Sequence, residues 1–243
     1  MTEFTRIIID PRHRSARYAL TSLERLHAIV ARSVSEEDYE NSTPPSEQSP
    51  SISVGNNRAL WRIDHDRSGQ SVKLYIVSET HPRDDILLSE LGVEVQDCSS
   101  CGYESFLSRL DCGQEWGFRL KANPTKSLPS GVAGQRGKRC GISNKDEQLE
   151  WLWKQGRAHG FHMPINRLEV PEVVIRESGS VNFSRRQSTV TLMSTVYEGV
   201  LAVDDPTLLR EALVSGIGRA KGYGFGLMTL LPLIGRNYSR SKP

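Results

Sequence analysis

Residues 215–233 read SGIGRAKGYGFGLMTLLPL and form the densest motif of the chain. We expect them to join a helix over residues 205–215 to a final strand near residues 225–231, in the order helix, loop, strand. A dinucleotide-binding fingerprint requires strand, loop, helix, with a glycine where this run has Lys221, so that interpretation is excluded. The run also lacks the Gly-Lys-Ser/Thr of a Walker A loop.

The glycines of this run indicate a binding function even though the run matches no known motif completely. They let the backbone approach a ligand closely, and their N–H groups, together with Arg219 and Lys221, can hold phosphates. The alternative is a tight packing turn. Residues 221–225 match the first five positions of the RNP1 signature, but that signature belongs on the third strand of its fold, and here one strand remains. The loop glycines are Gly216, Gly218, Gly222, Gly224 and Gly226.

The first half of the chain has the pattern β-α-β-β-α-β. A β-branched run at residues 5–10 predicts a buried strand, and the spacing of Thr21 and Glu24 predicts a capping box that starts a helix near Ser22. The next predicted elements are a strand pair at residues 59–65 and 72–78, a helix at 84–91 and a strand at 116–122. This order is that of a ferredoxin-like fold, which RNA-recognition modules also use.

The second half has the pattern of a shorter copy of the same plan. Its predicted elements are a helix over residues 144–159, extended runs over 161–175 and 188–203 joined by a polar hairpin, a helix over 205–215 and the final strand. We therefore expect an α+β protein of two tandem ferredoxin-like (RRM-like) domains, each an antiparallel sheet with helices on one face. The expected boundaries are 1–124 for the N-terminal domain, 125–143 for a basic linker, 144–234 for the C-terminal domain with the glycine-rich loop, and 235–243 for a basic tail.

The composition is that of an ordinary globular protein. The chain has 243 residues, of which 37% are hydrophobic and 25% are charged, and this excludes a collagen-like or wholly disordered protein. No apolar run approaches the ~18 residues of a membrane span. The opening MTEFTRIIID lacks the apolar core of a signal peptide, so we expect a cytoplasmic location.

The net charge of +2 conceals a segregation of charges. Residues 116–145 carry seven Lys or Arg and no acid, and residues 212–243 carry five and no acid. Acids gather elsewhere, for example in the Ser- and Pro-rich segment at residues 35–55. Clustered Lys and Arg without acids are typical of a polyanion-binding surface, and the alternative is a set of solvated loops.

The four cysteines do not form a recognisable metal site. Cys98 and Cys101 have the spacing of a zinc half-site, but the second half is missing because Cys112 and Cys140 are far apart in sequence. We therefore expect plain cytosolic thiols, with structural zinc as the weaker alternative. No cofactor is expected, and the chemistry is expected to need no metal.

Four stretches together resemble one family. They are residues 215–233, FRLKANPTK at 118–126, VYEGVLAVDDPTLLREAL at 196–213, and the N-terminal strand, Pro11, Arg-rich turn and helix with His27. In combination they closely resemble the CasE family, the CRISPR repeat-processing endoribonuclease of type I-E Cascade. The resemblance covers nearly the whole chain except the acidic segment.

The resemblance implies a fold, an activity and a set of partners. The fold is two tandem ferredoxin-like domains. The activity is metal-independent cleavage of precursor CRISPR RNA at the base of the repeat hairpin. The implied partners are the CRISPR repeat hairpin, the mature crRNA that stays bound as product, and the other Cascade subunits, with no membrane.

Metal-free cleavage of RNA requires a proton-transfer group. The ribose 2′-OH attacks the adjacent phosphate and leaves a 2′,3′-cyclic phosphate and a 5′-OH, and a group that titrates near neutral pH favours histidine. Position alone does not choose among the six histidines, and His27 could equally be a core-edge residue. The resemblance places the active-site histidine of the family at His27. A member of that family has a tyrosine three residues before this histidine, where this sequence has Glu24.

Basic residues near these motifs are candidates for holding RNA. Arg219 and Lys221 are placed for phosphate contacts by the glycine loop, and an arginine-bearing hairpin can follow an RNA groove. The candidate RNA-binding residues are Arg14, Arg17, Arg119, Lys121, Lys126, Arg185, Arg186, Arg219 and Lys221. Two other functions remain open: a structured-RNA binding module without catalysis, and, less favoured, a nucleotide-binding scaffold.

Overall fold

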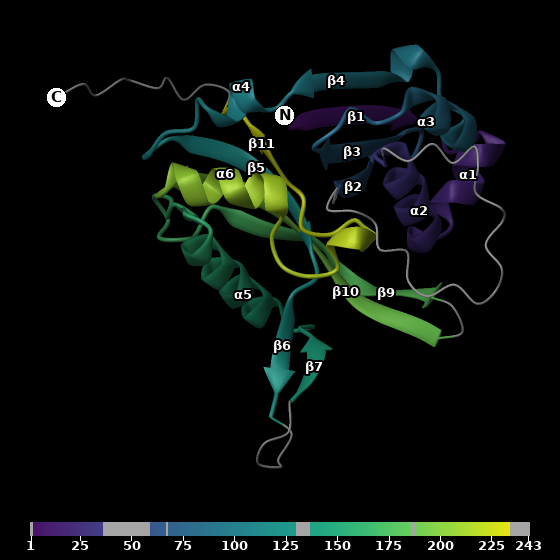
Figure 1. Cartoon of the computed structure of the whole chain (residues 1–243). Helices are drawn as coiled ribbons and strands as arrows, with labels where there is room; N and C mark the ends of the chain where they lie inside the picture. Colours follow the sequence, from purple (N-terminus) through teal and green to yellow (C-terminus); the bar gives the residue numbers. More distant parts are fainter. Residues whose placement is uncertain (1, 36–58, 67, 130–136, 186–187, 234–243) are drawn as a thin grey trace. The chain divides into compact units, whose positions relative to one another are not determined.

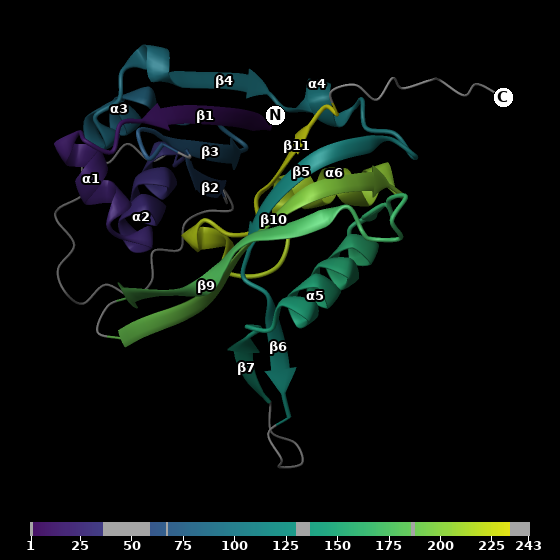
Figure 2. The ribbon, with the colours of Figure 1, turned by 180° about the vertical axis from the view of Figure 1, so that it is seen from behind.

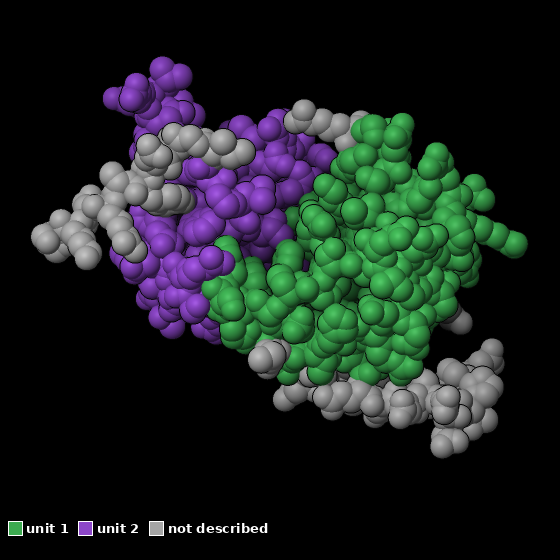
Figure 3. All heavy atoms as spheres, turned by 90° about the horizontal axis from the view of Figure 1, so that it is seen from above, with its two compact units in different colours: residues 1–106, 183–187, 222–224 green, residues 107–182, 188–221, 225–243 purple. Residues whose placement is uncertain are grey.

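The computed structural model describes residues 2–35, 59–66, 68–129, 137–185 and 188–233. The chain divides into two compact units, which Figure 3 shows in different colours. Unit 1 comprises Met1–Phe106, Phe183–Gln187 and Gly222–Gly224, and unit 2 comprises Leu107–Asn182, Ser188–Lys221 and Phe225–Pro243. Across the described ranges, no helix has both the length and the apolar character that a membrane span needs.

Unit 1 is built on an antiparallel sheet with the strand order β2-β3-β1-β4, and helices α1, α2 and α3 pack on one face (Figure 1). Its elements are β1 (Glu3–Ile9), α1 (Arg14–Leu20), α2 (Leu23–Ser33), β2 (Leu60–His65), β3 (Val72–Ser78), α3 (Asp84–Leu91), a 3-10 turn η2 (Val95–Asp97), β4 (Cys98–Gly102) and α4 (Glu104–Leu107), within which the unit ends. Ile7 of β1 lies opposite both Leu74 of β3 and Cys98 of β4. This strand order is that of a ferredoxin-like fold.

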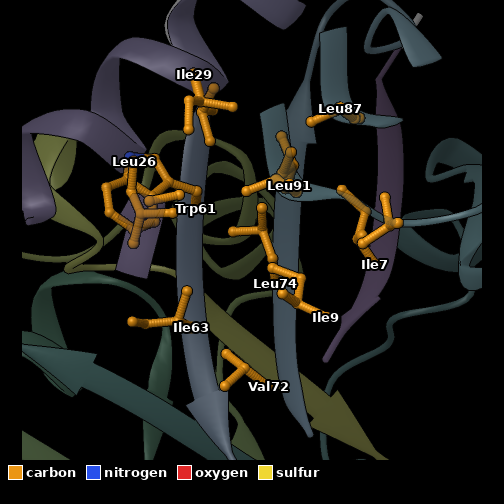
Figure 4. Packing of buried hydrophobic residues seen from close by; sticks show 14 of the residues in the cluster. Ile7, Ile9, Leu26, Ile29, Trp61, Ile63, Val72, Leu74, Leu87 and Leu91 are labelled. Atoms are coloured by element: carbon orange, nitrogen blue, oxygen red, sulfur yellow. The ribbon is translucent and has the colours of Figure 1, made fainter. Parts of the chain in front are cut away.

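The helix-facing side of this sheet holds the core of unit 1. Successive side chains of β1 alternate between buried and more exposed positions, as a strand with one covered face requires. Figure 4 shows Ile7 and Ile9 of β1 with Leu74, Trp61 and Leu26, all fully buried. Burial of each aliphatic side chain contributes about 1.5–3 kcal/mol. This core holds α2 against the sheet.

Helix α2 begins where the sequence predicted, with a different capping residue. Ser22 is the N-cap, and its hydroxyl oxygen accepts a hydrogen bond from the backbone N–H of Glu24 at 3.2 Å. Thr21, the expected first member of a capping box, instead donates its hydroxyl to the carbonyl oxygen of Tyr18 at 2.7 Å and closes α1. A serine N-cap stabilises a helix by about 1 kcal/mol.

Unit 2 repeats the plan with a second antiparallel sheet, in the order β11-β5-β10-β8 with β9 paired to β10 (Figure 2). Its elements are β5 (Glu115–Ala122), β6 (Thr125–Leu128), β7 (Lys138–Gly141), α5 (Lys145–Ala158), β8 (Phe161–His162), β9 (Val173–Arg185), β10 (Ser188–Val203), α6 (Pro206–Ser215), η3 (Lys221–Tyr223) and β11 (Met228–Leu231), although the ends of β9 and η3 belong to unit 1. Trp151 of α5 stacks on Tyr197 of β10, with ring centroids 6.2 Å apart. The predicted fold class, two tandem ferredoxin-like folds with helices on one face of each sheet, is confirmed.

One strand belongs to a different sheet from the one expected. The run at residues 116–122 was expected to complete the first fold, but β5 pairs with β10 and β11 and is the first strand of the second sheet. The fourth strand of the first sheet is β4, which the sequence analysis missed. Its sequence, CSSCG, shows no apolar alternation because most of its side chains are exposed at the sheet edge.

The expected linker and the expected polar hairpin both contain strand residues. The expected basic linker, 125–143, holds the hairpin of β6 and β7, with residues 130–136 outside the described part. The polar segment at 176–187 continues β9 as far as Arg185, and most of its described side chains apart from Phe183 are exposed, so this part of the strand shows few apolar residues. The boundaries 1–124 and 144–234 stay predictions. The tail 235–243 and the acidic segment from residue 36 onward lie outside the described residues.

Candidate active site and anion pocket

His27, the predicted catalytic residue, lies on α2 with an exposed side chain. Residues 222–224 of the glycine-rich loop belong to the same unit and approach it. A Cβ added at Gly222 would lie 3.4 Å from Cε1 and 3.6 Å from Nδ1 of His27. These are ordinary van der Waals distances, so the backbone of the loop passes close beside the imidazole ring at position 222.

Trp61 fixes this part of the loop to the core of unit 1. Its Nε1–H donates a hydrogen bond to the carbonyl oxygen of Gly222 at 3.1 Å, and its ring is fully buried. Gly224 has a φ of 80°, and a Cβ there would lie 2.8 Å from the Trp61 ring. Both the left-handed backbone and the close approach thus require glycine at position 224.

Tyr223 brings two further aromatic rings into the site. Its ring centroid lies 5.8 Å from that of His27 and 4.6 Å from that of Phe183, which β9 contributes and which is buried. No local pattern gives either aromatic residue a role. Tyr223 and Phe183 are about 40 residues apart in the sequence, and they lie about 200 and 160 residues from His27. The available signal was an aromatic residue placed between Gly222 and Gly224.

Unit 2 contains a pocket of about 510 Å³ whose lining is cationic. Arg139 of β7, Lys154 of α5, and Arg219 and Lys221 of the glycine-rich loop supply four positive charges, and the lining drawn from the described residues includes no carboxylate. The rest of the lining is Asn123, Thr125, Trp151, Gln155, His159, Gly216 and Gly218. A concave site with clustered cations favours an anionic ligand such as a phosphate.

The backbone at the edge of this pocket is strained. Ala220 has a φ of 63°, in the left-handed region that non-glycine residues rarely adopt. It stands between Arg219 and Lys221, both of which line the pocket. A residue held in this region costs about 1–3 kcal/mol, and such strain is concentrated at functional sites. Lys221 is held in place as well, because its Nζ donates a hydrogen bond to the carbonyl oxygen of Ser215 at 2.6 Å.

Helix α5 contributes residues to this pocket that were not predicted as binding residues. Trp151, Gln155 and His159 all line it, and Lys154 lies beside them. Their spacing of four residues places the first three on one face of the helix, so a helical wheel could have grouped them. Nothing in the local sequence indicates that this face meets the glycine-rich loop.

Other predicted RNA-binding residues already have partners within unit 2. Arg119 forms an ion pair with Glu198, to which Arg176 also donates from Nε at 2.6 Å. Burial opposes ionisation of Glu198, but Arg176 and Arg119 outweigh it and lower its pKa below the usual value. Lys126 pairs with Glu147, whose hydrogen bond raises the pKa of Lys126.

The remaining predicted residues are distributed over both units, and one of them lies outside the described residues. Arg14 and Arg17 are exposed on α1 of unit 1, while the Lys121 ammonium of unit 2 lies 5.5 Å from the ring centroid of Phe225. Arg185 is the last residue of β9, and Arg186 lies outside the described residues. The N–H of Gly226 donates to the carbonyl oxygen of Lys121 at 2.7 Å, so this glycine ties the loop to β5.

The Cys98-x-x-Cys101 spacing occurs on a strand. Residues three apart on a strand point to opposite faces, so β4 does not present the two thiols as a zinc half-site. Burial raises the pKa of Cys98, with Asp84 and Asp97 acting in the same direction. Among the residues that the structure describes, no three His, Cys, Asp or Glu side chains gather as metal ligands would.

The structure defines an α+β protein with two ferredoxin-like folds and one glycine-rich loop. Residues of this loop lie beside a histidine in unit 1 and line a cationic pocket in unit 2. This class of protein is able to bind polyanions. Comparison with known proteins identifies the family within this class. The model of the family described as CRISPR associated protein matches residues 4–232. The chain therefore belongs to this family, and the recognition of the chain as CasE-like is confirmed.

Individual relatives agree with this assignment. A Thermus thermophilus protein named CRISPR-associated endoribonuclease Cse3 is 25% identical over 234 residues, which cover 94% of this chain and 99% of that protein. An Escherichia coli protein named CRISPR system Cascade subunit CasE is 31% identical over 135 residues, or 51% of this chain and 62% of that protein. The solved structure of Thermus thermophilus Cse3 bound to an RNA representing a pre-cleavage complex superposes with a TM-score of 0.74, at 25% identity, and covers 95% of this chain and 99% of the other.

Proposed function

We propose that this protein is an RNA endonuclease that binds the hairpin of a CRISPR repeat, cleaves precursor CRISPR RNA, and stays bound to the mature crRNA with other Cascade subunits. The observation that carries the proposal is the exposed His27 beside the glycine-rich loop in a member of this family. The names of the relatives support it, since one is a CRISPR-associated endoribonuclease and the other a Cascade subunit.

The proposed reaction needs no metal ion. The ribose 2′-OH loses its proton to a general base and its oxygen bonds to the adjacent phosphorus. The bond from phosphorus to the 5′-oxygen breaks, and that oxygen takes a proton, which gives a 2′,3′-cyclic phosphate and a 5′-OH. His27 supplies one of the two proton transfers, since imidazole is the side chain that exchanges a proton near neutral pH.

The cationic pocket of unit 2 supplies phosphate contacts for the same RNA. Arg139, Lys154, Arg219 and Lys221 hold backbone phosphates there. Such contacts position the RNA and read little sequence. Arg14 and Arg17 on α1 add exposed cations in unit 1. The predicted contributions of Arg119 and Lys126 are smaller in this proposal, because each is already paired with a glutamate.

The test is single-turnover cleavage of a synthetic repeat hairpin in the presence of EDTA. We expect the wild-type protein to cut the RNA and His27→Ala to lower the rate by about 10²–10⁴-fold, which is the usual contribution of a general acid or base. His81→Ala is the matched control, because His81 is another half-exposed histidine of unit 1. Its rate should equal that of the wild-type protein.

The products and the substrate test the chemistry further. A 2′-deoxy substitution at the scissile nucleotide should abolish cleavage, and the 3′ end of the product should carry a cyclic phosphate. Cleavage of the deoxy substrate, or loss of activity in EDTA, would contradict the mechanism. A structured-RNA binding module without catalysis would instead show tight hairpin binding, no cleavage by the wild-type protein and no effect of His27→Ala.

A further inference from the structure

We propose that Tyr223 is a positioning residue that fixes the imidazole ring of His27 by ring packing, with Phe183 as its support. This inference deepens the proposed function and rests on it for the role of His27. The three rings come from three separate parts of the sequence, namely α2, the glycine-rich loop and the end of β9, and they meet within unit 1.

The ring contacts define the arrangement. The His27 and Tyr223 ring centroids are 5.8 Å apart with an interplanar angle of 50°, and the Tyr223 and Phe183 centroids are 4.6 Å apart at 44°. Both separations lie within the range of favourable tilted aromatic pairs. Phe183 is 8% exposed and therefore gives Tyr223 a largely buried surface to pack against.

The backbone that carries Tyr223 is fixed on both sides. The preceding residue, Gly222, accepts the hydrogen bond from Trp61 Nε1, and the following residue, Gly224, packs closely on the Trp61 ring in a left-handed conformation. Trp61 itself is fully buried in the core of unit 1. The Cα of Tyr223 is thus held by the core, and its side chain has two torsion angles left to fix.

The position of His27 on α2 gives packing against its ring a role. Its side chain is exposed, whereas its helix neighbours Leu26, Ile29 and Val30 are buried. An exposed side chain changes rotamer on the picosecond to nanosecond timescale. A misplacement of about 1 Å can lower a rate by about 10²-fold, so a ring that restricts the imidazole raises the fraction of time in which it is correctly oriented.

The proposed role belongs to the Tyr223 ring, and it can therefore be tested separately from any chemistry by the phenolic hydroxyl. A phenylalanine at position 223 retains the ring and loses the hydroxyl, while a leucine loses the ring. We expect Tyr223→Phe to cleave within about threefold of the wild-type rate. Tyr223→Leu should lower the single-turnover rate by about 10–100-fold and leave the affinity for the hairpin unchanged.

Phe183 and an unrelated tyrosine complete the set of variants. Phe183→Leu should lower the rate by a smaller factor, and the double variant with Tyr223→Leu should be no slower than Tyr223→Leu alone, because Phe183 acts through Tyr223. Tyr18→Leu is the control, since Tyr18 is an exposed tyrosine on α1 of the same unit. All variants should unfold at temperatures close to that of the wild-type protein, which excludes a general loss of structure.

Two results would overturn the proposal. If Tyr223→Phe is as slow as Tyr223→Leu, the hydroxyl acts in the reaction and ring packing is not the role. If Tyr223→Leu cleaves at the wild-type rate, the ring has no role at all.

A second measurement does not depend on cleavage. In protein with ¹³C-labelled histidine, the ring-current effect of Tyr223 should shift the His27 Cε1–H resonance. The resonance should move in Tyr223→Leu and stay in place in Tyr223→Phe. If the wild-type protein does not cleave RNA but the resonance shifts are as expected, the proposed function is contradicted and the packing of Tyr223 on His27 is still supported. An unmoved resonance in Tyr223→Leu would overturn the packing itself.

Discussion

The two units share one strand order and use it for different purposes. The sheet of unit 1 runs β2-β3-β1-β4 and that of unit 2 runs β11-β5-β10-β8, so each places its first and third strands at the centre. Unit 1 offers a histidine among aromatic rings, whereas unit 2 offers four cations around a pocket. The fold is common to both, and the side chains placed on it decide what each can do.

The difference between the histidine of unit 1 and the cations of unit 2 predicts different effects on the reaction rate and on the affinity for RNA. A single imidazole that exchanges protons can change the rate of a reaction, and permanent charges of Lys and Arg chiefly change how strongly a polyanion binds. The glycine-rich loop serves both, because Lys221 lines the pocket and the next residue, Gly222, approaches His27. Substitutions in the two units should therefore have separable effects.

The largest effect is expected from the tryptophan that anchors the loop in unit 1. Trp61→Ala removes a fully buried ring and its hydrogen bond to Gly222, so the free energy of unfolding should fall by about 3–5 kcal/mol. Trp153→Ala, on the exposed side of α5 in unit 2, should change it by about 0.5 kcal/mol or less. Urea unfolding measures both, and equal losses would contradict the assignment of Trp61 to the core.

The pocket of unit 2 should govern affinity and not rate. The double variant Lys154→Ala with Arg219→Ala removes two proposed phosphate contacts. The slope of log affinity against log salt concentration should therefore become shallower by about 2. Cleavage at saturating RNA should stay at the wild-type rate. Arg157→Ala, an exposed arginine of α5 outside the pocket, is the control, and a similar change of slope in this variant would show that the pocket is not special.

A smaller effect, on stability alone, is expected at Glu198 in the second sheet. Its pKa is lowered on folding, so its contribution is present above the pKa of the unfolded state and is lost as pH falls through the lower folded pKa. Glu198→Gln should cost about 1 kcal/mol or less of unfolding free energy at pH 7, with a difference from wild type that shrinks toward pH 3. Glu177→Gln, at an exposed position of β9, provides the comparison in urea unfolding at both pH values.

The smallest effect is expected at Lys126, a predicted RNA-binding residue. Its ammonium is paired with Glu147 on an exposed surface, so Lys126→Ala should change the affinity for the hairpin by about twofold or less. Arg219→Ala should weaken binding more, because Arg219 lines the pocket. Filter binding at one salt concentration compares the two variants, and equal losses would restore Lys126 to the RNA-binding surface.

Local patterns explain what could be predicted. The β-branched run of β1 and the start of α2 near Ser22 depend on neighbouring residues, and the structure contains both elements, with Ser22 as the cap where Thr21 was expected. The glycine run predicted a close backbone approach, which occurs at Gly222 and Gly224. The edge strand β4 was missed because exposed residues at an edge need no apolar pattern. Strand β5 was assigned to the wrong sheet, because strand pairing over about 80 residues leaves no local mark.

The amino-acid sequence by itself determined the fold class and the glycine-rich loop, because motifs and periodicity are properties of adjacent residues, and its resemblance to the CasE family singled out His27 as the catalytic candidate. Only the tertiary structure decided which residues surround that histidine and which cations share a pocket. Tyr223 and Phe183 meet His27 through contacts between distant segments. Arg119 and Lys126 are neutralised by glutamates brought to them by folding. Ion pairs and ring contacts form between side chains a few ångströms apart, and the sequence does not show which distant residues come that close.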